Sequence, residues 1–405
     1  MSSRRRSIWP ALVLPIALIA ASCGDDDAAD DGGDATAGPA SSSAAGTAAA
    51  TPSAPAATTA ATSPATTVST DASATTDGSG TTGGTDSAGT SGTTEGGSLT
   101  LYSGRNEELI APLLEDFEAA TGIDVEVRYG NSAEMGAALL EEGDGTPADV
   151  FYSQEVGAVG VLAEAGLMAP LPDEVVGLVD ERFQPAESNL WVGVTGRSRV
   201  IVYNPELVTE APTGVLELTD PMYEGQVAIV PSNAGFQAFV TAFRVSQGED
   251  AARQWLVDMQ ENGVITDIES NDDVLAAVDA GDVPIGLINH YYWARLVSER
   301  GPDGVTAQLV FPEGDDPGAL VNATAAGLTA RGAENPDALA FIEYLLSEEG
   351  QTYFATETSE YPLIEGVPDP EGVPPLEDLQ GPQLDLTDLE SLEETQALLT
   401  DLGLI

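Results

Sequence analysis

The stretch NHYYW, residues 289–293, places two adjacent tyrosines directly after the only histidine of the chain. A tyrosine offers a phenol oxygen, and oxygen donors suit hard, highly charged cations. On a strand, neighbouring side chains point to opposite faces, so Tyr291 and Tyr292 could not both reach one atom. In the first turn of a helix they are only about 100° apart. The pair can therefore share a ligand only if a helix begins at this point.

The flanking residues predict such a helix. VPIGLI, residues 283–288, reads as a buried strand, and Asn289 is a good N-cap residue for the helix that follows. Both phenols would then face the mouth of a cleft at the carboxyl end of a strand, where open α/β sheets bind ligands. The alternative is that the two rings only pack at a helix start. We interpret His290 as a residue that does not contact the ligand, and Trp293 as part of the core.

Residues 98–405 alternate between strand-like and helix-like segments separated by short turns that contain glycine. This pattern predicts an α/β fold with a mostly parallel sheet covered by helices. Two strand-like runs flank Arg197-Ser198-Arg199, which we interpret as a turn, and residues 337–354 read as one long helix. Two lobes joined by crossing strands would leave a cleft between them.

The N-terminal part is predicted to direct and tether the chain. Residues 1–22 read as a lipoprotein signal peptide, because three arginines precede a short apolar run that ends in small residues. Cys23 is the only cysteine, so no intramolecular disulfide can form, and we expect it to carry a lipid anchor. Residues 23–97 are rich in Thr, Ala, Ser and Gly and are predicted to form a disordered tether.

The charge of the chain excludes some partners. The formal net charge is −54, from 67 acidic and 13 basic residues, and every basic residue is an arginine. No basic surface of useful size can be assembled, so we expect no nucleic-acid partner. A strongly acidic surface favours a soluble monomer. Each of the few arginines is therefore a candidate for a specific role.

Several segments, in this order, resemble the ferric-ion-binding periplasmic proteins of bacterial ABC importers, a branch of the type 2, transferrin-like solute-binding proteins. The resemblance covers nearly all of residues 98–405, including the C-terminal tail. It implies a first lobe from residues 98–198 plus about 320–365, a second lobe from 199–319, and a tail, 366–405, that packs on the lobes. The matching stretches are LYSGRNEELIAPLLEDFEAATGI, ADVFYSQ, GRSRVIVYNPEL, YEGQVAIVPSNAGF, ESNDDVLAAV, VPIGLINHYYW, DPGALVNATAAGL and EYPLI.

The resemblance implies that Tyr291 and Tyr292 are the ligands of a ferric ion. Two phenolates would offset much of its charge, and protons would compete with the metal in acid. Many family members have a histidine where this chain has Asn106, and a glutamate where it has Gln154. We expect a two-tyrosine site completed by an exogenous anion and water. The candidates for a further protein donor are Glu155, Tyr102 and Tyr129.

The anion would be carbonate, phosphate or citrate. An arginine beside the metal can bind such an anion through two hydrogen bonds, which makes Arg105, Arg197 and Arg199 candidates. The alternative role for each is a salt bridge, which for Arg197 and Arg199 would fix the crossing between lobes. The resemblance also places around the anion the residues Asn233, Ala234, Gly235, Asn271 and Asn289.

The resulting hypothesis is an extracytoplasmic solute-binding lipoprotein, anchored to the outer face of the cell membrane, that delivers ferric iron to an ABC permease and its ATPase. The alternatives are the same fold binding a ferric chelate or another solute such as a phosphate-like anion, thiamine or a polyamine, and a wall lipoprotein without a transport role. We expect no enzymatic activity, because a single histidine and no GxSxG motif leave little nucleophilic machinery.

Overall fold

The computed structural model describes residues 96–405 except residue 383. The predicted signal peptide, Cys23 and the predicted tether as far as residue 95 lie outside the described residues. Within the described part, no helix is long and apolar enough to cross a membrane.

The first half begins with strand–helix units, as the sequence predicts. The helices α1 and α2 end at Gly122 and Gly143, both of which have positive φ, and Asn131 caps α2 in a capping box with Glu134. Strand β1 pairs in parallel with β2 and with β3. The elements are β1 (Ser98–Ser103), α1 (Glu107–Thr121), β2 (Asp124–Tyr129), α2 (Ser132–Glu142), β3 (Val150–Ser153) and α3 (Val156–Glu164).

The sheet is mixed, and the prediction of a mostly parallel sheet is wrong. Its main path runs β2-β1-β3-β9-β5-β7-β6. Among the described strands three pairings are parallel and six are antiparallel. The return strand β9 lies between β3 and β5 and runs against both. The further strands are β4 (Met168–Ala169), β5 (Val192–Tyr203), β6 (Val227–Ala228), β7 (Ile285–Asn289), β8 (Gln308–Val310), β9 (Val321–Thr329) and β10 (Tyr361–Pro362).

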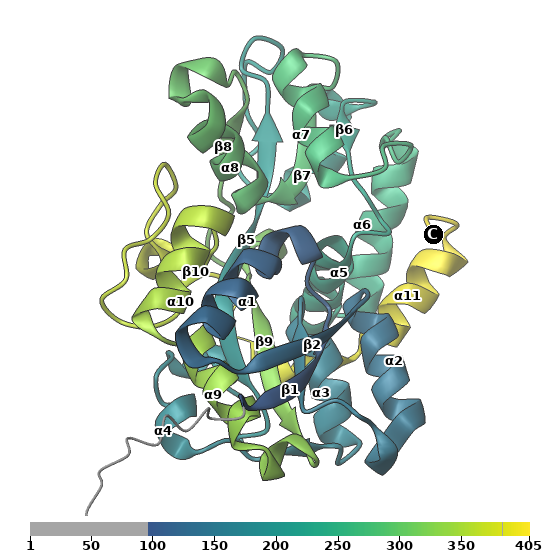
Figure 1. Ribbon diagram of the computed structural model, residues 1–405. Helices are drawn as coiled ribbons and strands as arrows, with labels where there is room; N and C mark the ends of the chain where they lie inside the picture. The colour runs from purple at the N-terminus through teal and green to yellow at the C-terminus, as the bar shows by residue number, and fades with distance from the viewer. Residues whose placement is uncertain (1–95, 383) are drawn as a thin grey trace, which may run out of the picture. The chain divides into compact units, whose positions relative to one another are not determined.

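Strand β5 corrects the predicted turn at Arg197-Ser198-Arg199. It is one continuous strand that exchanges one partner for another: Val192–Ser198 pairs with β9, and Arg199–Tyr203 pairs with β7. Two ladders in succession keep the three residues extended, and the amide of Ser198 at the change of partner donates to His290, so no reversal of the chain is needed. Figure 1 shows β5 running from the group of β1, β2 and β9 to the group of β6, β7 and β8.

The structure corrects the prediction of one long helix near the C-terminal end of the chain. The segment predicted as one helix over residues 337–354 is divided at Leu346, because the Ser347 hydroxyl accepts a hydrogen bond from the amide of Gly350 and caps a new helix. The remaining helices are α4 (Asp173–Val176), α5 (Ala234–Gln247), α6 (Glu249–Glu261), α7 (Asn271–Ala280), α8 (His290–Arg300), α9 (Pro336–Leu345), α10 (Glu348–Tyr353) and α11 (Leu392–Asp401).

The buried apolar side chains form separate clusters on the two sides of the point where β5 changes partner. The first cluster contains Leu101, Phe151 and Trp191, all with an exposed fraction of 0%. Two further clusters cover opposite faces of β5 and β7, one around Ile201 and one around Val200. Alternate residues of one strand thus serve two cores.

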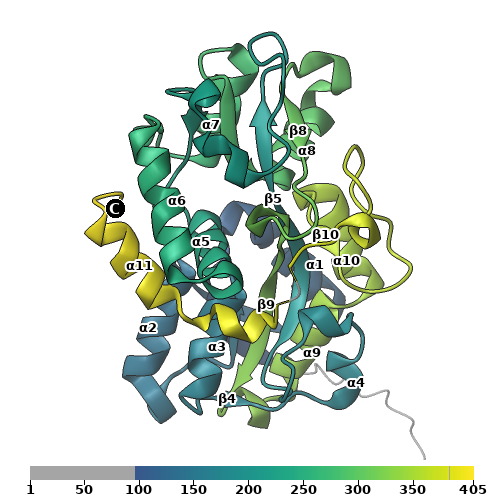
Figure 2. The same ribbon diagram turned by 180° about the vertical axis from the view of Figure 1, so that it is seen from behind.

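The C-terminal segment contributes to more than one of these clusters. Leu386 and Leu389 are buried in the first cluster, whereas Leu398 and Leu399 of α11 are buried in the cluster around Ile201. Both views show α11 beside α5 (Figure 1 and Figure 2), and the two helices are in contact.

Candidate metal and anion site

The tyrosine pair stands at the start of a helix. Strand β7 ends at Asn289, which occupies the N-cap position of α8, so Tyr291 and Tyr292 lie in the first turn. Their ring centroids are 4.4 Å apart, and Tyr291 is only 3% exposed. The Asn289 side chain makes no capping hydrogen bond. Its Oδ1 instead accepts a hydrogen bond from Arg199, so the side chain contacts this arginine and does not cap the helix.

Both tyrosines line one cavity of about 450 Å³. Its walls come from the start of α1, from α7 and from α8. Arg295, one turn further along α8, places its guanidinium 5.7 Å from the centroid of the Tyr291 ring and 5.5 Å from that of Tyr292. The lining residues are Asn106, Glu108, Leu109, Asp272, Leu275, Ala276, Tyr291, Tyr292, Arg295, Leu296, Glu299 and Arg300.

The Tyr292 phenol holds its proton firmly. Burial raises its pKa well above the usual range of a phenol, and the neighbouring Tyr291 raises it further. The amide of Asn271 lies near enough to oppose part of this rise. Neither Oδ1 nor Nδ2 of that buried amide meets hydrogen-bond geometry with a described residue. A cation that binds here must displace the proton.

His290 is held by backbone groups on both sides of its ring. Its Nδ1 accepts a hydrogen bond from the amide of Ser198 at 3.2 Å, and its Nε2 lies 3.0 Å from the carbonyl oxygen of Ser359. The ring is fully buried and stacks on Tyr361 with centroids 4.5 Å apart. Burial lowers the His290 pKa to about 4. The side chain therefore positions the start of α8 as a neutral group.

The arginines differ in how their charge is balanced. Arg105 is fully paired at its terminal nitrogens: Nη2 donates to Glu360 at 2.6 Å, and Nη1 donates to Gln154. Arg197 contacts Glu155 at 2.8 Å and lies 3.9 Å from Glu360. These contacts are the salt bridges that the sequence left open as an alternative role.

Among the described residues, only one of the two carboxylate oxygens of Glu155 has hydrogen-bond partners. Its Oε2 accepts hydrogen bonds from Arg197 and from Asn322, whereas its Oε1 is buried without a partner among the described residues. Burial raises the pKa of Glu155, and the Arg197 guanidinium opposes that rise. Asn322 stands opposite Arg197 in the β5–β9 ladder, which explains why the two donors converge on one oxygen.

Arg199 has no carboxylate partner in the described part of the chain. It is 4% exposed, and it donates only to the Asn289 side chain at 3.2 Å and to the Leu287 carbonyl at 2.8 Å. Burial lowers its pKa to about 10, so the guanidinium still carries its charge near neutral pH. An unbalanced buried cation is costly, so this side chain is available for an anion.

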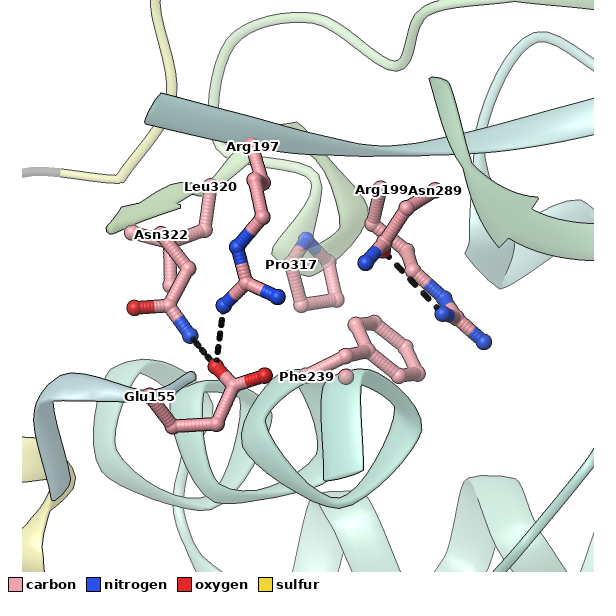
Figure 3. Close-up of a pocket in the computed structure, with 9 residues that line it drawn as sticks. Glu155, Arg197, Arg199, Phe239, Asn289, Pro317, Leu320 and Asn322 are labelled. Atoms are coloured by element: carbon pink, nitrogen blue, oxygen red, sulfur yellow. Dashed lines mark hydrogen bonds and ion pairs between the residues drawn. The ribbon is translucent and has the colours of Figure 1, made fainter. Parts of the chain in front are cut away.

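Arg197, Arg199 and Glu155 share a small cavity of about 20 Å³ (Figure 3). Figure 3 shows the Glu155–Arg197 pair on one side and the Arg199–Asn289 pair on the other, with Phe239 and Pro317 between them. The start of α5 closes one wall, because a Cβ at Gly235 would lie 2.9 Å from Nδ2 of Asn289. The lining residues are Glu155, Arg197, Arg199, Gly235, Phe239, Asn289, Pro317, Leu320 and Asn322.

Known proteins with the same sequence pattern and fold bind ferric iron. Residues 145–382 match the family described as bacterial extracellular solute-binding protein. An Fe(3+)-binding periplasmic protein of Serratia marcescens is 33% identical over 76% of this chain and 90% of its own length. The chain belongs to this family of solute-binding proteins.

Solved structures agree on the fold. Iron-bound HitA from Pseudomonas aeruginosa is 32% identical, with a TM-score of 0.70 over 76% of this chain and 99% of its own. A Trichodesmium FutA structure in complex with iron and citrate is 26% identical, with a TM-score of 0.64 over 76% of this chain and 100% of its own. These likenesses confirm the predicted two-lobe, α/β fold of the type 2 periplasmic binding proteins.

Two candidate donors of this solute-binding protein lie apart from the tyrosine cavity. The Tyr102 hydroxyl donates to Glu142, the last residue of α2, at 3.0 Å and accepts from Arg128 at 3.0 Å. Tyr129 ends β2 and is half-buried, and burial raises its pKa. Neither residue lines the cavity that holds Tyr291 and Tyr292. No group of three or more His, Cys, Asp or Glu side chains in the described residues could hold a metal ion.

Some of the residues predicted to bind the anion line the small cavity together, and others lie outside it. Asn233 caps α5, its Oδ1 accepting from the amide of Phe236 at 3.1 Å, and Ala234 opens that helix. Gly235 and Asn289 line the small cavity with two of the predicted arginines. Arg105 does not line it, and Asn271 lies at the start of α7 on the side of the tyrosines.

Sequence reasoning missed several residues of the site. Arg295 follows Tyr291 by four residues and Tyr292 by three, so helical spacing alone could have placed it on the same face. Asn322 and Glu360 carry no comparable local signal. Their roles depend on β9 and on the turn before β10, which come near β5 only in the folded chain.

Proposed function

We propose that the chain is an extracytoplasmic solute-binding protein that captures ferric iron through Tyr291 and Tyr292 and delivers it to an ABC importer. The observation that supports this most directly is the pair of phenols in one helical turn, 4.4 Å between ring centroids, lining one cavity. The relatives named for ferric-iron binding share this chain's fold and about a third of the residues over the aligned 76% of the chain.

The coordination chemistry fits a trivalent ion. Two phenolates supply hard oxygen donors and two negative charges. The described part of the cavity wall also carries the carboxylates of Glu108 and Asp272. Asn106, at the position where many relatives have a histidine, faces the same cavity and offers an amide oxygen. Oxygen donors alone therefore surround the ion in this proposal, together with an anion.

The anion in this proposal occupies the region of Arg199, Asn289 and the start of α5. An unbalanced buried guanidinium and free helix amides both favour negative charge. An anion bound here would also contact β5, β7 and α5, and the lobes, residues 98–198 with about 320–365 and residues 199–319, would close around it and the metal.

A ferric chelate is the second candidate ligand. The tyrosine cavity of about 450 Å³ is larger than a single ion needs and falls within the range of about 300–1,000 Å³ for small-molecule sites. Retention of labelled nitrilotriacetate, which is not one of the candidate anions, at one molecule per ion would identify a chelate. Iron retained without label would identify the free ion.

A visible absorption titration with ferric citrate tests the metal site. We expect the full chain to develop a phenolate-to-iron band that saturates near one iron per chain. The double variant Tyr291→Phe, Tyr292→Phe should lose the band. Tyr223→Phe is a matched control, because Tyr223 is also buried but its hydroxyl donates to the Glu210 carbonyl. Absence of the band in the unaltered chain would disprove a tyrosine-ligated ferric site.

The lipid anchor is a separate part of the proposal. Metabolic labelling with a fatty acid should mark the unaltered chain and fail to mark a Cys23→Ala variant. Equal labelling of both chains would remove Cys23 as the attachment point.

A further inference from the structure

The small cavity beside β5 contains buried polar atoms of both signs that no described residue satisfies. On the donor side are Nε of Arg199 and Nη1 of Arg197. On the acceptor side is Oε1 of Glu155, whose other oxygen already receives Arg197 and Asn322. The side chains of Glu155 and Arg197 are 5% and 2% exposed, so bulk water does not satisfy these atoms.

A ligand that satisfies both sides must accept and donate. A guanidinium only donates hydrogen bonds, and an ionised carboxylate only accepts them. An anion without a proton could bind the arginines, but its oxygens would repel Oε1 of Glu155. An anion that carries a hydroxyl group can place its charged oxygens on the arginines and donate its O–H to Glu155.

We propose that this cavity selects a protonated oxyanion, such as hydrogencarbonate or hydrogenphosphate, and that Glu155 is the residue that excludes fully ionised anions. The inference rests on the proposed function only in taking this anion to be the partner of the iron. Glu155 thereby acts as an anion-specificity residue: Arg197 and Asn322 fix its Oε2, and its Oε1 accepts a hydrogen bond from the O–H group of the ligand.

The size of the cavity favours the smaller of these anions. A volume of about 20 Å³ is close to the space that one water molecule needs. Phe239 and Pro317 form apolar walls that cannot hydrogen-bond to additional oxygens (Figure 3). The planar hydrogencarbonate therefore requires less widening than a tetrahedral anion, and we expect it to bind more tightly than hydrogenphosphate.

Two pairs of anions of matched shape test the selectivity. Nitrate is planar like hydrogencarbonate, and sulfate is tetrahedral like hydrogenphosphate, but neither carries a proton near neutral pH. The full chain is first measured without iron, by its thermal unfolding temperature at equal ionic strength in each anion. It is then loaded with ferric nitrilotriacetate, and the apparent iron affinity is measured in each anion by competition with a chelator.

We expect the proton-bearing member of each pair to raise the unfolding temperature and to strengthen iron binding roughly ten- to hundredfold over its matched partner. That is the size expected when a buried acceptor would otherwise be left unpaired. In Glu155→Gln the side-chain amide can donate as well as accept, so the difference within each pair should shrink to about twofold or less.

Glu142→Gln is the matched control. Glu142 also pairs with an arginine, Arg128 at 2.9 Å, but lines neither the tyrosine cavity nor the small one. It should keep the full preference for proton-bearing anions. A folded Glu155→Gln chain that retained this preference would overturn the role of Glu155.

The remaining outcomes separate this inference from iron binding. Equal effects of nitrate and hydrogencarbonate, or tighter binding of sulfate than of hydrogenphosphate, would overturn the inference while leaving iron binding intact. No effect of any anion would also overturn it, and would make Glu155 the cavity's own counter-ion. Loss of the iron band in every anion, with the thermal preference kept, would overturn the proposed function alone.

Discussion

At the scale of single residues, the site combines a buried phenol that resists ionisation, Tyr292, with arginines whose polar atoms are only partly paired. Tyr292 is buried against Tyr291, and burial raises its pKa above the usual range. Arg199 lies near both rings and lowers the electrostatic cost of their ionised forms. A ferric ion supplies the remaining stabilisation, because a bound cation favours the deprotonated ligand.

Iron binding should therefore weaken as the pH falls. Because an ordinary phenol is protonated throughout the neutral and acidic range, each tyrosine that binds iron as a phenolate releases a proton. The apparent affinity should fall by about tenfold per pH unit for each proton displaced. Competition with a chelator at pH 8, 7 and 6 measures this slope, corrected for the protonation of the chelator. A slope of zero would contradict phenolate ligation.

Prediction from sequence was strongest at this scale for Tyr291 and Tyr292. The two tyrosines follow a strand and an N-cap residue, so they lie in the first turn of a helix, and the helical geometry fixes the angle between their side chains. The partners of Glu155 could not be predicted in the same way, because Asn322 is 167 residues away along the chain and lies near Glu155 through the pairing of β3 with β9. Long-range pairing leaves no periodic signal in a single sequence.

At the scale of elements, β5 and the α9–α10 segment show where the local pattern was insufficient. The prediction of a turn at Arg197-Ser198-Arg199 relied on polar residues between two apolar runs. The ladder partners instead keep these residues extended, with both arginines on one face of the strand. Tertiary pairing thus overrides a local polar signal.

The division between α9 and α10 depends on Ser347. Its hydroxyl accepts from the amide of Gly350 at 3.1 Å and satisfies one of the free amides of the new helix. Ser347→Ala should lower the free energy of unfolding by about 1 kcal/mol, the usual effect of losing an N-cap. Urea unfolding of the iron-free chain measures the change.

Ser347→Asp is the control for that variant, because an aspartate can also accept at an N-cap. It should retain most of the stability that the alanine loses. If both variants were equally destabilised, the capping hydrogen bond would not be the cause.

At the scale of the whole described chain, the C-terminal segment is part of the core structure. Leu386 and Leu389 join one apolar cluster, and Leu399 joins another cluster that also contains Phe236; Leu399 and Phe236 are both fully buried. Arg244 of α5 donates to the carbonyl of Ser391 at 2.8 Å and to Thr395 at 2.7 Å. The segment is therefore fixed by polar as well as apolar contacts.

Leu399→Ala should lower the free energy of unfolding by about 2–5 kcal/mol, because it removes a buried side chain and leaves a cavity. Thermal or urea unfolding of the iron-free chain gives the value. Ile405→Ala is the matched control, since Ile405 is 45% exposed and should change stability little. Equal effects of the two substitutions would contradict a core role for α11.

The exchange of partners within β5 has a mechanical consequence for the two arginines. Arg197 stands opposite Asn322 of β9, and Arg199 stands opposite Asn289 of β7, with Ser198 between them. Any bend of the strand at Ser198 changes the separation of the two guanidinium groups directly. The distance between these two charges therefore depends on the angle between the parts of the sheet on either side of Ser198. An anion bound by both arginines would fix that angle.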